Sequence, residues 1–192
     1  MRAGEAQTWI ETNRADLVLS EKPERDERFY FVPLFADRFR IIVNPSHPWA
    51  TGSCVPRGEL PKQPHLRCRA SPQTQRMIDD FLARDGIVLN TMVEMETIEA
   101  ITEFLKTTLC FSILPTWMVD QELISRSLVA LPLSRRTLDQ TWGFLHRRDR
   151  PLNHAESTFV KLCRDGMQRF RRKCGGLSQS GSSRDAIPSA NG

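Results

Sequence analysis

The stretch HLRCRASPQTQRMIDDFLARDG, residues 65–86, predicts one strand followed by one helix. Residues 65–69 form a short run in which apolar and basic side chains alternate, which is typical of a strand. Ser71 and Pro72 follow, and Ser is a favoured helix N-cap while Pro is favoured at the first helical position. The apolar residues after them recur at helical spacing as far as Gly86, where a helix can end. The stretch therefore predicts the strand–helix unit from which α/β domains are built.

The same alternation continues along the chain. Short apolar runs bounded by turn residues predict strands, and apolar residues at helical spacing predict helices. Because the two alternate, we expect an α/β protein with a mainly parallel sheet. The expected strands cover residues 15–19, 29–35, 38–43, 65–69, 88–95, 110–114, 128–133 and 141–147, and helices are expected to begin near residues 5, 72, 97, 117 and 153.

Two of the expected strands are unusual. Pro33 cannot donate a backbone hydrogen bond, so residues 29–35 are expected to form an edge strand or an irregular one. Residues 15–19 are apolar enough to be buried, which would need neighbours on both sides, yet little chain precedes them. Either that strand lies at an edge of the sheet, or the chain is a fragment of a longer protein.

Composition favours a soluble globular protein of the reducing cytoplasm. The chain has 192 residues, 40% hydrophobic and 26% charged. No apolar run approaches the roughly 20 residues that cross a bilayer, and the N-terminus lacks a secretory apolar core. The five cysteines are odd in number and none are in C-x-x-C spacing, which predicts free thiols rather than disulfides or a zinc site. We therefore expect a cytoplasmic protein without a membrane partner.

The charge pattern and the motifs argue against nucleic-acid binding and catalysis by this chain. The formal net charge is +4, and the basic excess lies between residues 135 and 173 without interleaved aromatic residues. A solvated face explains that pattern better than a nucleic-acid patch. No G-x-S-x-G elbow, Cys–His signature or glycine-rich phosphate loop is present. We expect no enzyme activity and no cofactor, and we expect residues 175–192, rich in Gly and Ser, to be a disordered tail.

An ordered series of short motifs identifies a family. Residues 14–19 (RADLVL) resemble the family pattern G-E-L-D-L-A-I, and residues 47–50 (HPWA) resemble H-P-L-A. Residues 99–115 begin with EAI and end with ILP, as in the pattern E-A-I … A-L-L-P. Residues 152–159 resemble the closing L-S-P-A-A-x-x-F helix. From Glu5 to about Phe170, the chain resembles the C-terminal effector-binding domain of LysR-type transcriptional regulators.

The resemblance implies a fold like that of periplasmic binding proteins, with two Rossmann-like lobes and a cleft between them. The first lobe would comprise residues 5–43 and 111–170, and the second would comprise residues 54–108. Compared with the family, the winged helix-turn-helix domain and the first strand and helix of the effector domain are missing, so the first lobe would be incomplete. Thr108 and Cys110 also stand where the family has glycines.

The same resemblance directs attention to residues that could bind a small effector in the cleft. An organic anion would suit the helix N-terminus at Ser71, Pro72, Gln73 and Thr74, although these residues could simply cap the helix. Thr97 has the same two interpretations at the next helix. Arg69, with Arg67, could meet an anion or lie on an exposed strand face. The last two candidates lie on the strand that returns to the first lobe, where they could line the cleft or belong to the core: Phe111 and Ser112.

Two functions follow from this. The chain could be the ligand-sensing module of a LysR-type regulator, assembled as a homodimer or tetramer and reaching DNA only through a helix-turn-helix domain absent from this chain. Alternatively, it could be a truncated, inactive remnant or a stand-alone small-molecule binding protein. An upstream reading frame for a winged helix-turn-helix would separate the two.

Overall fold

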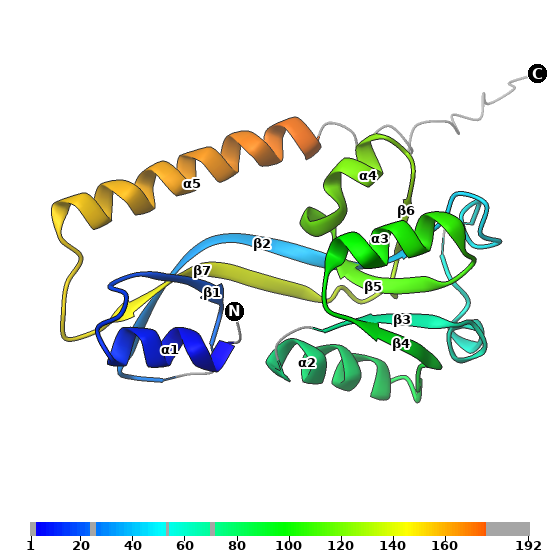
Figure 1. Cartoon of the computed structure of the whole chain (residues 1–192), viewed down its shortest axis with the longest axis horizontal. Helices are drawn as coiled ribbons and strands as arrows, with labels where there is room; N and C mark the ends of the chain where they lie inside the picture. Colours follow the sequence, from blue (N-terminus) through cyan, green and yellow to red (C-terminus); the bar gives the residue numbers. More distant parts are fainter. Residues whose placement is uncertain (1–2, 24–25, 53, 70–71, 176–192) are drawn as a thin grey trace, which may run out of the picture.

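The long strand β2 (Phe29–Val43) joins the two halves of the molecule. The computed structural model describes residues 3–23, 26–52, 54–69 and 72–175. In that part of the chain, seven strands form a sheet with the order β1-β7-β2-β5-β3-β4, and β6 also pairs with β2 (Figure 1). The other strands are β1 (Val18–Glu21), β3 (His65–Cys68), β4 (Thr91–Met95), β5 (Phe111–Pro115), β6 (Val129–Pro132) and β7 (Asp139–Arg147).

Strand β2 corrects one sequence expectation and supports another. The two strands predicted at residues 29–35 and 38–43 are one continuous strand, because the chain stays extended past Pro33. The register with β7 shifts between Pro33 and Phe35, as expected for an irregular strand. Among the described strands, residues 29–38 pair with β7 alone, so this half of β2 is an edge as well as irregular, while β5 and β6 pair with residues 39–43. Pro33 thus lies on a strand segment with one partner strand, where a missing backbone N–H is tolerated.

The prediction of a mainly parallel sheet was wrong. Strand β3 runs parallel to β4 and β5, as the strand–helix alternation of this segment predicts. The pairs β1–β7, β2–β7, β2–β5 and β2–β6 are antiparallel. Apolar runs indicate burial but not strand direction, so nothing in the sequence indicates that β2 runs antiparallel to β5, β6 and β7.

The local signals for helices are confirmed. Helix α2 (Pro72–Ala83) begins at the predicted proline, and Gly86 has a φ of 68° just beyond its end. Asn153 and Glu156 form a reciprocal capping box, with both N–H···O distances at 2.9 Å. The remaining helices are α1 (Ala3–Glu11), α3 (Ile98–Thr107), α4 (Asp120–Ile124) and α5 (His154–Gly175), with short 3₁₀ turns η1 (Arg57–Lys62) and η2 (Thr116–Val119). Among the described residues, no helix has the length and apolarity to cross a membrane.

Helices cover both faces of the sheet, which gives three apolar cores. Helix α2 buries Ile78, Phe81 and Leu82 on one face of the β2–β5–β3 half, and α3 buries Ile101 and Leu105 on the other (Figure 1). A third, smaller core lies between α1 and the β1–β7 half. Helix α5 lies across the opposite side of that half (Figure 1). The fold is thus α/β, with two parts that share β2.

The predicted division into lobes of residues 5–43 with 111–170 and of residues 54–108 stays a prediction. The strand pairing is relevant to the predicted boundaries. The second half of β2 and all of β5 fall in the predicted first lobe, and both are in one sheet with β3, which falls in the predicted second lobe. Strand β1 has β7 as its partner within the described residues and lies at the end of the strand order. The expected disordered tail lies outside the described residues, apart from Gly175 at the end of α5.

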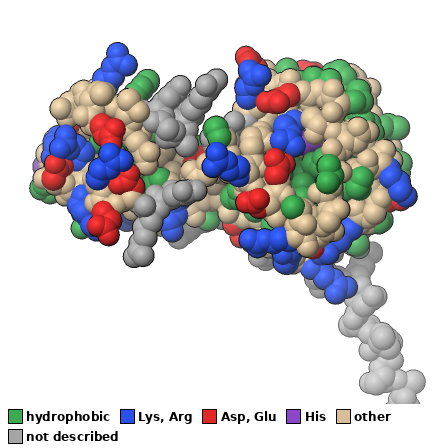
Figure 2. All heavy atoms as spheres, turned by 90° about the horizontal axis from the view of Figure 1, so that it is seen from below, with side chains coloured by type: hydrophobic (Ala, Val, Ile, Leu, Met, Phe, Trp, Pro, Cys, Tyr) green, Lys and Arg blue, Asp and Glu red, His purple; other side chains and the backbone are tan. Residues whose placement is uncertain are grey.

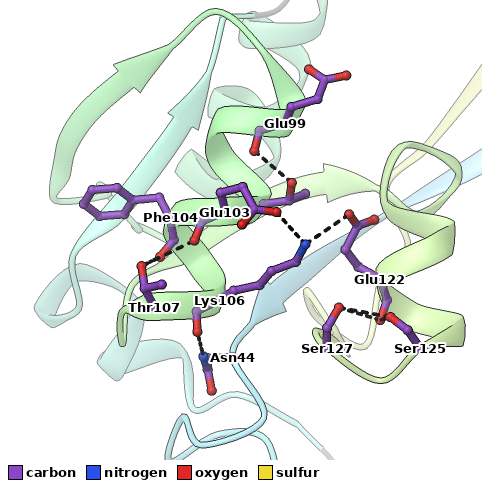
Figure 3. Close-up of polar contacts among 10 residues, drawn as sticks. Asn44, Glu99, Glu103, Phe104, Lys106, Thr107, Glu122, Ser125 and Ser127 are labelled. Atoms are coloured by element: carbon purple, nitrogen blue, oxygen red, sulfur yellow. Dashed lines mark hydrogen bonds and ion pairs between the residues drawn. The ribbon is translucent and has the colours of Figure 1, made fainter.

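Polar contacts at the C-terminal end of α3 hold this part of the fold together. The ammonium group of Lys106 lies 2.7 Å from Glu103 and 3.6 Å from Glu122, which joins α3 to α4 (Figure 3). The side-chain amide of Asn44, just after β2, donates to the carbonyls of Leu105 at 3.3 Å and Lys106 at 2.5 Å. Asn44 thereby satisfies carbonyls that the helix end leaves unpaired.

We expect Asn44→Ala to lower the free energy of unfolding by about 1 kcal/mol, because the last carbonyls of α3 lose their donor. The substitution also removes the acceptor for the Ser46 N–H, now 2.8 Å away. Urea denaturation measures the loss. Asn44→Asp is the sharper comparison: it keeps an acceptor for Ser46 but places a negative charge at a helix C-terminus, where it is unfavourable. An aspartate variant as stable as the parent would contradict this role for Asn44.

Candidate binding cleft

A cleft of about 480 Å³ lies between the two parts of the molecule. Glu21 of β1 and Gln140 and Trp142 of β7 form one wall. Strand β3, the N-terminal half of α2, the start of α3 and the end of β5 form the other. The volume suits a small metabolite rather than a polymer.

The topology explains why the cleft is there. Strands β3, β4 and β5 are parallel, so their carboxyl ends meet at one edge, where the cleft-lining residues Arg69, Glu96 and Pro115 lie. Open α/β sheets bind ligands in this position. Helices α2 and α3 begin at the same edge, and their free N–H groups favour anions. At α3, Thr97 is the N-cap and accepts from Ala100 N at 3.3 Å.

Charged side chains in the cleft are already paired with one another. Arg67 donates to Gln75 at 3.0 Å and forms an ion pair with Asp79 at 3.2 Å. Arg69 pairs with Glu94 at 3.3 Å and also with Glu96. The arginines are therefore positioned by their partners at the mouth of the cleft, and a ligand anion would share or displace these carboxylates.

The first turn of α2 bridges the two walls. Thr74 is buried, and its hydroxyl accepts a hydrogen bond of 2.8 Å from the side-chain amide of Gln140 on β7. Gln73 donates from its side chain to the carbonyl of Lys22, just after β1, at 2.9 Å. Both bonds join α2 to the β1–β7 half, so a change in the relative position of the two walls must stretch or break them.

Burial shifts the pKa values of two titratable groups at the base of the cleft. Burial, with a smaller contribution from the Arg67 charge, lowers the pKa of His65 to about 4, so this imidazole is neutral at pH 7. Its Nδ1 lies 3.0 Å from the hydroxyl of Thr91. Burial, and then the Glu94 charge, raises the pKa of the Cys68 thiol. The indole N–H of Trp142 is buried and has no hydrogen-bond partner among the described residues. The base of the cleft is thus uncharged at neutral pH.

The predicted site residues do not all line the cleft. Arg69 and Thr74 line the cleft, and Gln73 and Pro72 lie beside it in the first turn of α2. Ser71 lies outside the described residues. The strand residues predicted to line the cleft or belong to the core are fully buried: Phe111 packs in the apolar core against Trp49 and His65, and Ser112 donates to the Leu66 carbonyl at 2.7 Å.

Sequence reasoning missed the wall formed by β1 and β7. Gln140 and Trp142 alternate on β7, but nothing in the sequence places that strand opposite α2. Glu21 is the last residue of β1 and lies beyond the strand predicted at residues 15–19. Gln140 also lies just before the strand predicted at residues 141–147, so no signal in the sequence marked it as part of this wall. Within the described part of the chain, no group of His, Cys, Asp or Glu side chains could hold a metal ion.

Comparisons with known proteins agree with this architecture. The family model described as "LysR substrate binding domain" matches residues 2–168. The relatives include the "HTH-type transcriptional regulator CbbR" of Cereibacter sphaeroides, 29% identical over 77% of this chain and 49% of the relative. Another is the "DNA-binding transcriptional dual regulator OxyR" of Escherichia coli K12, 24% identical over 82% of this chain and 52% of the relative. The chain thus spans about half the length of the curated relatives it matches.

Solved structures give the same fold. The CcmR regulatory domain from Synechocystis PCC6803, solved in complex with 2-PG, has a TM-score of 0.75 at 16% identity, over 86% of this chain and 80% of that chain. The effector-binding domain of QuiR, solved in complex with shikimate, has a TM-score of 0.72 at 14% identity, over 88% and 79%. These neighbours confirm the fold like that of periplasmic binding proteins. The chain belongs to the LysR substrate-binding domain family and has the fold of the effector-binding domains of LysR regulators.

Proposed function

We propose that this chain binds a small organic anion in the cleft and relays that binding to the DNA-binding domains of a LysR-type regulator. The observation that carries the proposal is the position of the cleft. It lies where three parallel strands end and two helices begin, with Arg67 and Arg69 at its edge. Guanidinium groups and helix N-termini both favour carboxylates.

The lining also indicates how a ligand would be oriented. A ligand carboxylate at the Arg67 side would accept from the guanidinium now shared with Gln75 and Asp79. The indole N–H of Trp142 on the opposite wall has no partner in the part of the chain that the structure describes, and could donate to a second acceptor on the ligand. The formal charges of the lining Arg and Glu side chains balance, since Glu21 and Glu96 accompany the two arginines. Specificity would therefore depend on the position of charges rather than on their sum.

The relay would act through the bonds that join the walls. A ligand that contacts α2 and β7 together favours the arrangement in which Thr74 and Gln140 are in contact. Such a ligand shifts the population of wall arrangements by its differential affinity for them. The remaining parts of the proposal follow from the family: a homodimer or tetramer in the cytoplasm, DNA contacts made only by a helix-turn-helix domain outside this chain, and no enzyme activity. The 2-PG and shikimate complexes of the neighbours support a small-molecule effector.

The test is calorimetric titration of the purified chain with a panel of small carboxylates, combined with Arg67→Ala. We expect one member of the panel to bind with one-to-one stoichiometry, and we expect Arg67→Ala to weaken it by roughly tenfold, because a hydrogen-bonded charge pair is lost. The matched control is Arg14→Ala, since Arg14 is exposed in the turn after α1, outside the cleft. Equal affinities for the two variants would contradict binding in the cleft, and no binding by any carboxylate would contradict the ligand class.

A further inference from the structure

A second concave surface lies near the C-terminal end of α2, apart from the cleft. It is lined by Cys54, Val55, Arg57, Pro132, Ser134 and Arg135, and none of these lines the cleft. Its elements are the segment before η1 and the loop after β6, near the C-terminal end of α2. We call it the Arg135 groove.

The Arg135 groove holds more positive than negative charge. Asp85 is mostly buried and accepts from two guanidinium groups, Arg57 at 2.9 Å and Arg136 at 2.8 Å. Arg135 is exposed and has no ion pair among the described residues. Two arginines therefore share one carboxylate, and Arg135 adds a third positive charge without an ion pair among the described residues. Elsewhere the surface is different, and Figure 2 shows basic and acidic side chains lying side by side over much of one face.

The neighbours of Arg135 are held in place. Arg136 is fixed by Asp85 and by its position over the Phe81 ring, 5.0 Å from the ring centroid. The hydroxyl oxygen of Ser134 accepts from the Arg136 backbone N–H at 3.0 Å and from Arg57 at 3.4 Å. With both lone pairs used in this way, the Ser134 hydroxyl still has its proton to donate. The groove thus offers a free guanidinium beside a hydroxyl donor.

The rest of the lining is apolar. Val55 is buried in the main core and Pro132 is half-buried, so together they present an apolar floor beside Arg135. A compact inorganic anion would leave that floor uncovered. A carboxylate with an apolar body matches both features, because its carboxylate pairs with a guanidinium and its body covers apolar surface.

We propose that the Arg135 groove is a second ligand site, distinct from the cleft, for a small carboxylate with an apolar body. Arg135 and Ser134 bind the carboxylate, and Val55 and Pro132 contact the body. The site does not depend on the proposed cleft function, because no residue is shared.

Cys54 provides a local readout, since it is an exposed free cysteine in the lining. The purified chain is alkylated with iodoacetamide at increasing hexanoate concentration, and the rate at each cysteine is measured by peptide mass spectrometry. We expect hexanoate to slow alkylation of Cys54 with half-protection in the millimolar range, as befits a ligand with few atoms. Cys163, half-buried on α5, is the internal control and should be unaffected.

Variants and analogues decide the interpretation. Arg135→Gln is expected to raise the half-protection concentration roughly tenfold, because the charged hydrogen bonds are lost, whereas Arg14→Gln leaves it unchanged. Arg67→Ala, in the cleft, should also leave Cys54 protection unchanged, which separates this site from the proposed effector site. Hexanol and inorganic phosphate are expected to protect at least tenfold less well. Equal protection in Arg135→Gln would overturn the site, and equal protection by hexanol or by phosphate would overturn the ligand class.

Discussion

Replacing Gly143 by alanine is expected to lower the free energy of unfolding by about 3 kcal/mol or more, the largest effect that the structure predicts for a single methyl group. A Cβ atom at this position would lie 2.3 Å from the carbonyl oxygen of Val32 and 2.9 Å from the Cα of Pro33. Both contacts are with backbone, which cannot move aside as the end of a flexible side chain can. The third contact is 2.7 Å from the ring of Phe31.

The position of Gly143 makes relaxation costly. It pairs with Pro33 on β2 and with Ser20 on β1, so β7 is held from both sides at this point. The register of β2 shifts immediately afterwards, between Pro33 and Phe35. A close backbone approach of this kind is a place where a sheet needs glycine. Moving β7 away would weaken its pairing with both neighbours and disturb the wall that carries Gln140 and Trp142.

Gly166→Ala is the matched control, because it adds the same methyl group in the middle of α5, where nothing lies within 4 Å of the new Cβ. Alanine is the better helix former, so this variant should gain up to about 1 kcal/mol. Thermal and urea denaturation of the two variants should therefore shift in opposite directions. A Gly143→Ala protein within about 0.5 kcal/mol of the parent, the range of ordinary surface substitutions, would show that β2 and β7 are not packed this closely.

The part of the fold that the sequence predicts is the part with local signals. The unit from β3 through α2, β4 and α3 to β5 follows from the order of apolar runs, the proline at the start of α2, the Thr97 cap and Gly86. Each of these signals acts over a few residues, and the connection in a strand–helix–strand unit has a known handedness. The wall of the cleft that this unit forms was predictable for the same reason, which is why Arg69 and Thr74 were among the candidates.

The opposite wall depends on long-range pairing, which a single sequence does not reveal. Gln140 and Thr74 are joined by a hydrogen bond although they are 66 positions apart. The continuity of β2 through Pro33 depends on a register shift that only its partner β7 makes possible. The burial of Phe111 and Ser112 also depends on the tertiary structure. Strand β5 lies between β2 and β3 and is covered on both faces, so none of its residues is exposed.

The cleft and the Arg135 groove lie near opposite ends of α2. The N-terminal turn of α2 is bonded to β7 through Thr74, and its C-terminal end leads to Asp85, which holds Arg57 and Arg136. Helix α2, packed in the core by Ile78, Phe81 and Leu82, therefore connects the two sites.

Lowering the pH from 7 to 5 is expected to reduce the free energy of unfolding by about 2 kcal/mol through His65 alone. Burial lowers the pKa of this imidazole from 6.5 to about 4 in the folded protein. Between these values the unfolded chain takes up a proton that the folded chain does not, so stability falls as the pH decreases. The full loss, about 3 kcal/mol, is reached below pH 4. Burial also lowers the pKa of His47, which acts in the same direction.

The carboxylates change the free energy of unfolding at a lower pH than these histidines do. Arg38 holds the pKa of Asp139 below its ordinary value of 3.8, and the Asn153 N–H does the same for Glu156 relative to 4.5. Stability from these groups is present above their ordinary pKa values and is lost as the pH falls further. Measurements between pH 7 and pH 5 therefore report mainly on His65 and His47.

Urea denaturation at half-unit pH steps tests the role of His65. His65→Phe keeps a ring beside Phe111, whose centroid is 5.1 Å from that of the imidazole, but cannot take up a proton. The variant should lose most of the pH dependence, whatever its stability at pH 7, and His65→Asn should do so while retaining a polar atom near Thr91. His154→Gln, at the exposed start of α5, is the control and should keep the parent slope. If His65→Phe kept the parent's pH dependence, the dependence would have to come from another group. His65 would then take up its proton equally well in the folded and the unfolded protein.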